Sequence, residues 1–168
     1  CIRDSLCTDD TSLRKNFGYA ALSKIYHELE INKFLINRQR HSKEQYDANT
    51  IMKMLVYSRL LSPASKKSSF DNREQFFEKT DYSLDDVYRC LSFFDKHKEN
   101  LQVWMNDKIK ENYGRDTNLI YYDVTNYYFE SDDQNDFLRK GVSKEHRPNP
   151  IVQMGLFMDN NGIPITYE

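Results

Sequence analysis

Up to about residue 114, apolar side chains recur along the chain at the spacing of an α-helix. Between residues 22 and 29 they follow the i, i+3, i+4, i+7 pattern, which puts them on one face of a helix. Between residues 46 and 61 apolar side chains occur on nearly every side of the expected helix, as is typical of a helix buried on several sides. The pattern predicts helices over 11–30, 46–61, 63–78, 83–94 and 98–113.

Residues that favour helix ends mark several of these boundaries. Ser62 and Pro63 suit the N-cap and the first helical position of a new helix. Ser83 and Asp86 have the spacing of a capping box, with Asp in place of the usual Glu or Gln. Gly114 suits a left-handed C-cap, so we expect the last helix to end there.

Beyond residue 117 the helical spacing gives way to short runs of β-branched and aromatic residues. The run 119–129 is too short for a surface helix and lacks the polar face of one, and it predicts a buried central strand. Two later apolar runs, 151–158 and 163–167, flank the dipeptide Asn161-Gly162. An Asn-Gly turn between two apolar runs is the strongest short-range signal of a β-hairpin. We therefore expect three antiparallel strands in this part of the chain.

Together these elements indicate an α+β chain, with a mostly helical region over 1–117 and a strand-rich region over 118–168. The length of 168 residues allows one domain, or one and a part. A composition of 39% hydrophobic and 30% charged residues is that of a globular protein and not of a disordered one. No apolar run approaches the roughly 20 residues that span a bilayer, and no signal peptide is recognisable. We therefore expect a cytoplasmic protein without a membrane partner, in which the three cysteines stay reduced.

One acid, Asp123, lies inside the apolar run that predicts the first strand. Burying a carboxylate is costly unless it is paired, hydrogen-bonded or bound to a metal ion. Asp123 is therefore either a salt-bridged or exposed residue at a strand edge, or a ligand of a hard cation such as Mg²⁺ or Mn²⁺. Two such ions about 3.5–4 Å apart can activate a water or a 3′-hydroxyl and stabilise the leaving oxygen of a phosphodiester. That chemistry needs two or three converging carboxylates, so Asp123 alone is not a complete site.

The residues that follow Asp123 have two interpretations each. Thr125 and Asn126 either orient the acid or its metal-bound water, or make ordinary contacts between strands. The net charge of −2 does not decide for or against nucleic acid, but four Lys and Arg against one Glu gather in 139–147. This basic stretch is either a solvated surface or a set of phosphate contacts. In the second case the DNA-contacting residues are Arg139, Lys140, Ser143, Lys144 and Arg147.

The predicted helices 83–94 and 98–113 also have two interpretations. They either pair as a helix-turn-helix that recognises a DNA end, or they pack as ordinary helices. Acids in the loops and at the turn, including Asp159, are most simply solvated loop or turn residues.

Four stretches of the strand-rich region share their order and spacing with a known family. They are the acid-bearing run 122–130, a Gly-x-Ser-Lys-x-x-Arg pattern at 141–147, the run 153–156, and Gly162-Ile163-Pro164. In this respect the chain resembles the DDE transposases of bacterial insertion sequences. The resemblance is specific over about 118–168 and weaker over 59–66, which is similar to the helical region of that family.

The resemblance implies a ribonuclease H-like core that cuts DNA at transposon ends and joins the 3′-hydroxyl to target DNA. Asp123 would be its first catalytic acid and a ligand of two Mg²⁺ or Mn²⁺ ions, and 118–168 would hold its first three strands. The family's second Asp and its Glu follow the hairpin. We therefore expect an N-terminal fragment of a transposase, which opens on Cys1 rather than Met and does not catalyse alone. DNA and, during synapsis, further copies of the protein are the implied partners.

A second hypothesis comes from another class of protein. A non-catalytic DNA-binding module, such as a repressor-like derivative or the product of a decayed element, would share the basic stretch and would need no acid. Replacing Asp123 with Asn separates the two hypotheses, since only a metal site loses Mn²⁺ affinity.

Overall fold

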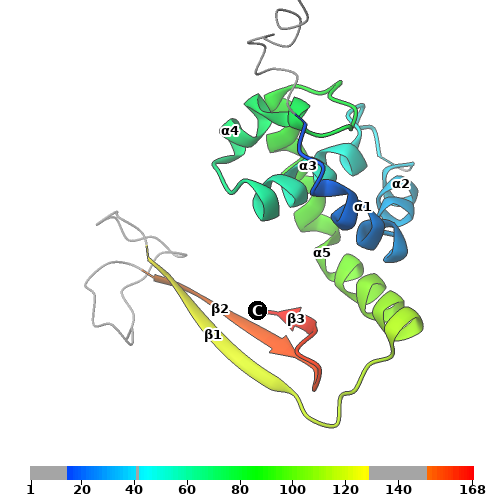
Figure 1. Ribbon diagram of the computed structural model, residues 1–168, viewed down its shortest axis with the longest axis vertical. Coiled ribbons are helices and arrows are strands. Elements are labelled where there is room, and N and C mark those ends of the chain that lie inside the picture. Colours follow the sequence, from blue (N-terminus) through cyan, green and yellow to red (C-terminus); the bar gives the residue numbers. More distant parts are fainter. Residues whose placement is uncertain (1–14, 41, 129–150) are drawn as a thin grey trace, which may run out of the picture. The chain divides into compact units, whose positions relative to one another are not determined.

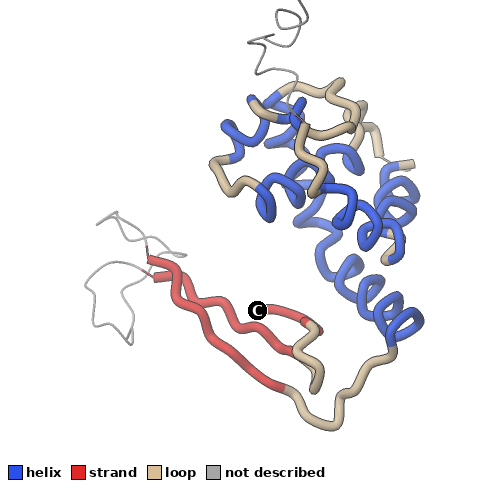
Figure 2. The backbone as a smooth tube through the Cα atoms, viewed as in Figure 1, coloured by secondary structure: helices blue, strands red, loops and turns tan. Residues whose placement is uncertain are grey.

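The computed structural model describes residues 15–40, 42–128 and 151–168, and its chain divides into two compact units (Figure 1). The first unit, Cys1–Lys108, is built of helices over its described residues. The second unit, Ile109–Glu168, contains the end of the last helix and a three-stranded sheet (Figure 2). The predicted combination of a helical region and antiparallel strands, an α+β arrangement, is confirmed.

Five α-helices and a short 3-10 helix are present among the described residues. Their bounds are α1 Tyr19–Glu28, α2 Ile31–Gln39, α3 Ala48–Leu61, α4 Lys66–Asp71, η2 Arg73–Gln75 and α5 Leu84–Tyr113. The predicted helix over 11–30 corresponds to α1, and residues 11–14 lie outside the described part. Glu30 adopts a left-handed conformation with φ of 52°, which ends α1 and lets the chain turn directly into α2. The sequence pattern did not predict α2.

The core of the helical unit lies between α2, α3 and α5. Phe34 and Leu35 of α2, Ile51 of α3, and Val87 and Cys90 of α5 are among its most deeply buried members. The all-round apolar pattern of α3 is explained by this position, because α1 and α4 also contact this helix. Asp47 caps α3 through side-chain acceptors for the backbone N–H groups of its first turn, and it lies one residue after the predicted start at residue 46.

The start at Ser62 and Pro63 that we predicted for the helix 63–78, which corresponds to α4, is wrong. Ser62 ends α3, since its N–H donates to the carbonyl of Ser58, and the helix begins three residues later with Ser65 as N-cap. The Ser65 hydroxyl accepts a hydrogen bond from the backbone N–H of Ser68 at 3.2 Å. A Pro at the first helical position is a preference and not a requirement, and here the side-chain cap determines where the helix starts.

The two helices predicted over 83–94 and 98–113 are one continuous helix, α5. The predicted capping box is confirmed, because Ser83 N–H donates to the Asp86 carboxylate at 2.8 Å and Asp86 N–H donates to the Ser83 hydroxyl at 3.1 Å. No turn interrupts the helix, so the helix-turn-helix interpretation of this pair is wrong. Gly114, with φ of 73° and its N–H donating to the carbonyl of Lys110, ends α5 as predicted.

The sheet of the second unit has the strand order β1-β2-β3, with both neighbouring pairs antiparallel. Its strands are β1 Tyr121–Tyr128, β2 Ile151–Met158 and β3 Pro164–Tyr167. The predicted hairpin is confirmed: Gly162 takes a φ of 75° at the turn, and its N–H donates to the carbonyl of Asp159. The positive φ explains the Gly at this position, since other residues adopt it at a cost.

The prediction that the first strand is buried and central is wrong for the described residues. Within the described sheet β1 pairs only with β2, so it is an edge strand. Tyr121, Tyr122, Val124 and Tyr127 of this strand are each between 37% and 56% exposed. In the sequence, apolar and aromatic residues on both faces of a strand suggest that the strand is buried. Burial also requires a layer that covers each face, and the described residues of this unit do not provide one.

A buried ion pair connects the loop before β1 to the hairpin turn. The Arg115 guanidinium donates to the Asp159 carboxylate at 3.3 Å and to the carbonyl of Pro164 at 3.2 Å. The other Asp159 carboxylate oxygen accepts the backbone N–H groups of Asn161 and Ile163, both at 2.9 Å. Asp159 is fully buried, so its interpretation as a solvated turn residue is wrong. None of the helices in the described ranges is long and apolar enough to span a membrane.

Candidate functional site

Asp123 lies in the middle of β1, directly opposite Leu156 of β2. Its side chain is exposed. It makes no hydrogen bond or ion pair with another residue in the part of the chain that the structure describes. A carboxylate held on a strand with its oxygens unengaged can accept a cation or a hydrogen-bond donor without first breaking an internal contact.

The pairing of β1 with β2 determines which residues share a face with Asp123. Because successive side chains on a strand point to opposite faces, Thr125 lies on the face of Asp123, about 6.6 Å further along the strand. Asn126 lies on the opposite face, where its side-chain oxygen accepts a hydrogen bond of 3.0 Å from Gln153. Of the two predicted supporting residues, the structure brings Thr125 to the side of Asp123 and directs Asn126 away from it.

Apolar side chains surround Asp123 on its face of the sheet. Tyr121 and Tyr127 lie two and four residues away on β1, and Leu156 and Met154 lie opposite on β2. The hydroxyl of Tyr127 is 4.0 Å from the sulfur of Met154. No cation is therefore provided by these neighbouring strand positions, and the charge of Asp123 is left for a partner outside the sheet.

The opposite face of the sheet is packed more closely around a glycine. The ring of Tyr122 packs against Phe157 in a tilted arrangement, with 4.6 Å between the ring centroids and 40° between the ring planes. A Cβ atom added at Gly155 would lie 2.6 Å from the hydroxyl oxygen of Tyr122. The absence of a side chain at Gly155 therefore leaves the space that the Tyr122 ring occupies over β2.

Two other acids near the hairpin, Asp116 and Asp159, are occupied by structural contacts. Asp159 is held by Arg115 and by the turn, as described above. The carboxylate of Asp116 accepts the backbone N–H of Asn118 at 3.0 Å and the side-chain amide of Asn160 at 2.8 Å. These hydrogen bonds hold the pKa of the Asp116 carboxyl below its ordinary value, the bond from the Asn118 backbone contributing most.

The described residues contain no group of three or more His, Cys, Asp or Glu side chains that could together hold a metal ion. A metal site of three carboxylates that included Asp123 would therefore need ligands from outside the described ranges. The predicted DNA-contacting residues fall within 129–150, which also lie outside the described part of the chain. These are Arg139, Lys140, Ser143, Lys144 and Arg147.

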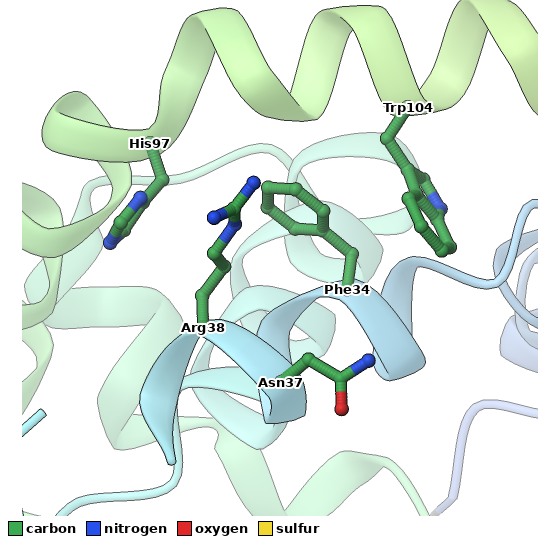
Figure 3. A pocket seen from close by; sticks show the side chains of 5 residues that line it. All are labelled: Phe34, Asn37, Arg38, His97 and Trp104. Carbon is green, nitrogen blue, oxygen red and sulfur yellow. The ribbon is translucent and has the colours of Figure 1, made fainter. Parts of the chain in front are cut away.

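The structure also contains a pocket that the sequence pattern did not indicate. It has a volume of about 400 Å³ and lies between α2 and α5 in the helical unit, lined by Phe34, Asn37, Arg38, His97 and Trp104 (Figure 3). Its residues come from two helices that are separated by 44 residues of sequence, 40–83. The only signal in the sequence was the absence of acids from the segment 31–40, which carries three Lys and Arg residues.

Comparisons with known proteins do not supply a function. No protein family, no curated protein and no solved structure matches the chain. The chemistry of Asp123 and its surroundings is therefore the basis for a functional assignment.

Proposed function

We propose that this chain is part of a metal-dependent DNA strand-transfer enzyme of the DDE transposase type, and that Asp123 supplies its first metal-binding carboxylate. One observation carries the proposal: Asp123 presents an unengaged carboxylate from the middle of the first strand of an antiparallel sheet with the order β1-β2-β3. This is the position that the resemblance to DDE transposases assigns to the first acid. The ribonuclease H-like identity of the sheet is part of the same proposal.

The donor chemistry of Asp123 fits Mg²⁺ or Mn²⁺, because both ions prefer carboxylate oxygens. When bound, such ions supply charge stabilisation to the attacking and leaving oxygens of a phosphodiester. The role of this chain in that reaction is to hold one carboxylate on a rigid strand. Thr125, on the same face, is placed to orient the water molecules around a bound ion.

The composition of the basic stretch supports a DNA substrate. Arg139, Lys140, Ser143, Lys144 and Arg147 belong to the segment of sequence between Tyr128, the last residue of β1, and Ile151, the first residue of β2, and these two strand residues pair with each other. Asp123 is five residues before Tyr128, which corresponds to about 17 Å along a strand. Lys and Arg side chains of this segment would bind a phosphate backbone without reading its sequence.

The proposal places the protein in the bacterial cytoplasm, where its DNA ends and target are located. Transposases synapse two ends, so the proposal includes assembly with a further copy of the protein on DNA.

Paramagnetic broadening by Mn²⁺ tests the role of Asp123. In an NMR titration of the full chain, we expect the amide signals of Asp123, Val124 and Leu156 to broaden before the others, since they surround the carboxylate. Asp123→Asn should abolish this preference. Asp107→Asn, which removes an exposed carboxylate from α5, should leave it unchanged.

The same titration separates the enzyme from a non-catalytic DNA-binding module. A module that binds DNA without metal chemistry would show no preferential broadening at β1, or would show broadening that Asp123→Asn does not affect. Either result would refute the assignment of Asp123 as a metal ligand.

A further inference from the structure

The pocket between α2 and α5 combines aromatic rings with a cation. The Arg38 guanidinium lies between the imidazole of His97 and the ring of Phe34, and Trp104 stands on the other side of that ring (Figure 3). The guanidinium carbon is 5.3 Å from the centroid of Phe34, and the centroids of Phe34 and Trp104 are 5.8 Å apart. A volume of about 400 Å³ falls in the range of small-ligand sites, which is about 300–1,000 Å³.

The indole of Trp104 is held in a defined orientation. Its Nε1–H donates to the carbonyl of Leu29 at 3.0 Å. The Lys108 ammonium lies 5.6 Å from the centre of the indole and pairs with the Glu30 carboxylate at 3.1 Å. Trp104 is half-buried, so part of the ring remains accessible while its position is already fixed. A ring held in this way loses little conformational entropy when a planar ligand stacks on it.

The electrostatic environment of the pocket is positive. Arg38 is exposed and forms no ion pair with a carboxylate among the residues that the structure describes. Burial lowers the pKa of His97, and the nearby charges of Arg38 and Lys96 lower it further. No acid is among the causes of that shift, so an anionic group beside Arg38 and His97 would meet positive charge.

We propose that this pocket binds one unpaired nucleotide of a DNA strand, with its base against Trp104 and its phosphate at Arg38. The inference rests on the proposed function for the choice of DNA as the ligand. Every base has a π-face that stacks on an aromatic side chain, and a guanidinium matches the geometry of a phosphate. Asn37 lines the same pocket, and its exposed amide offers both a donor and an acceptor to the edge of a base.

A nucleotide fits these features better than a peptide side chain does. A carboxylate ligand would use Arg38 but not the rings, and an aromatic side chain would use Trp104 but not the unpaired guanidinium. A nucleotide uses both features at once. Base-paired DNA does not, because its bases are stacked inside the duplex, so the pocket is expected to select single-stranded or frayed ends.

Trp104 is the chain's single tryptophan, and its fluorescence therefore reports on the pocket directly. The full chain is titrated with a short single-stranded oligothymidylate, and binding is followed by Trp104 emission and by the anisotropy of a dye on the DNA. We expect saturable quenching of Trp104 with the same midpoint as the anisotropy curve. A duplex of matched length should quench less at equal saturation.

Two arginine variants separate the pocket from general electrostatic attraction. Arg38→Ala should weaken binding about tenfold, as expected for the loss of one charge-assisted hydrogen bond. Arg40→Ala removes the same charge from an exposed residue that ends α2 and does not line the pocket, and it should change the affinity less than threefold by anisotropy.

Three results would overturn the proposal: unchanged Trp104 emission at saturating DNA, equal losses from both arginine variants, or equal quenching by duplex and single strand. Tighter binding of oligouridylate than of oligothymidylate would assign the pocket to RNA and overturn the assignment to DNA. None of these results affects the Mn²⁺ titration at Asp123. Failure of the pocket is therefore distinguishable from failure of the proposed function.

Discussion

The buried pair of Arg115 and Asp159 should determine the stability of the hairpin that supports β1. Asp159→Ala removes the partner of an arginine that is itself only 7% exposed in its side chain. It also removes the acceptor for the backbone N–H groups of Asn161 and Ile163. Removing one partner of a buried ion pair lowers the free energy of unfolding by about 3–5 kcal/mol. Arg115 keeps its hydrogen bond to the Pro164 carbonyl at 3.2 Å, so we expect Asp159→Ala to destabilise the hairpin by about 3 kcal/mol, the lower end of this range.

Two further variants separate the contact with Arg115 from the hydrogen bonds of the turn. Asp159→Asn keeps a side-chain oxygen for the two backbone N–H groups but turns its NH₂ group toward the Arg115 guanidinium, so both the charge and the acceptor for Arg115 are lost and we expect a destabilisation of about 2 kcal/mol. Asn160→Ala removes one exposed hydrogen bond to Asp116, and we expect it to destabilise the hairpin by less than about 1 kcal/mol. The order of the three variants is the test of the reasoning.

Hydrogen exchange of the hairpin amides measures these effects without requiring global unfolding. Gly155 and Glu168 donate to each other's carbonyls at 2.9 Å, so their amides report on the pairing of β2 with the end of the chain. A loss of about 3 kcal/mol corresponds to exchange that is roughly 150-fold faster. Amides of α3, in the other unit, should exchange as before. If Asp159→Ala accelerates Gly155 and Glu168 less than threefold, the buried pair does not stabilise the hairpin and the reasoning is wrong.

Two other predictions concern the helical unit. Glu78→Ala should destabilise the chain by about 2–3 kcal/mol in urea unfolding, because it leaves the buried Lys53 without the carboxylate that lies 3.0 Å away. Glu28→Ala, at an exposed i,i+4 pair, should cost less than about 0.5 kcal/mol, and equal losses would contradict the prediction. The hydrogen bonds from Ser83 hold the pKa of the Asp86 carboxyl below its ordinary value of 3.8. The stabilisation of the α5 N-terminus is therefore present above pH 3.8 and lost as the pH falls through the lower folded pKa. NMR titration should show that Ser83→Ala moves the pKa of Asp86 back up, and an unchanged value would contradict the assignment.

The features that the sequence predicted correctly are those that a few adjacent residues determine. Ser83 and Asp86 form their capping box within one turn, whatever surrounds the helix. Gly114 and Gly162 each adopt a positive φ that few other residues tolerate, so the helix end and the hairpin turn are visible in the sequence. Asp123 falls in the predicted strand for the same reason, because β-branched and aromatic neighbours favour an extended backbone.

The features that the sequence did not predict depend on residues far apart in the chain. The helix α2 is stabilised by burial of Phe34 and Leu35 against α3 and α5, and its own apolar periodicity is weak. Asp159 is buried by Arg115, which lies 44 residues earlier, and neither residue indicates the pair by itself. The break expected within α5 does not occur, since no Pro or Gly interrupts the segment 95–97 and an ion pair joins Asp95 to Lys98.

The pocket between α2 and α5 was missed for the same physical reason. Arg38 and His97 become neighbours only once α2 exists and packs against α5. Thr125 and Asn126 were equivalent as sequence neighbours of Asp123, and the strand pairing distinguishes them by placing them on opposite faces.

The most direct test of the central claim is the effect of Mn²⁺ on DNA affinity. If Asp123 and a DNA phosphate share a metal ion, Mn²⁺ must tighten DNA binding, and by thermodynamic reciprocity DNA must tighten Mn²⁺ binding. In anisotropy titrations, Mn²⁺ should increase the affinity of the unmodified chain and of Asp107→Asn by the same factor, and Asp123→Asn should show no increase. An equal effect of Mn²⁺ on Asp123→Asn and on the unmodified chain would contradict the claim that Asp123 is a metal ligand in a DNA-processing site.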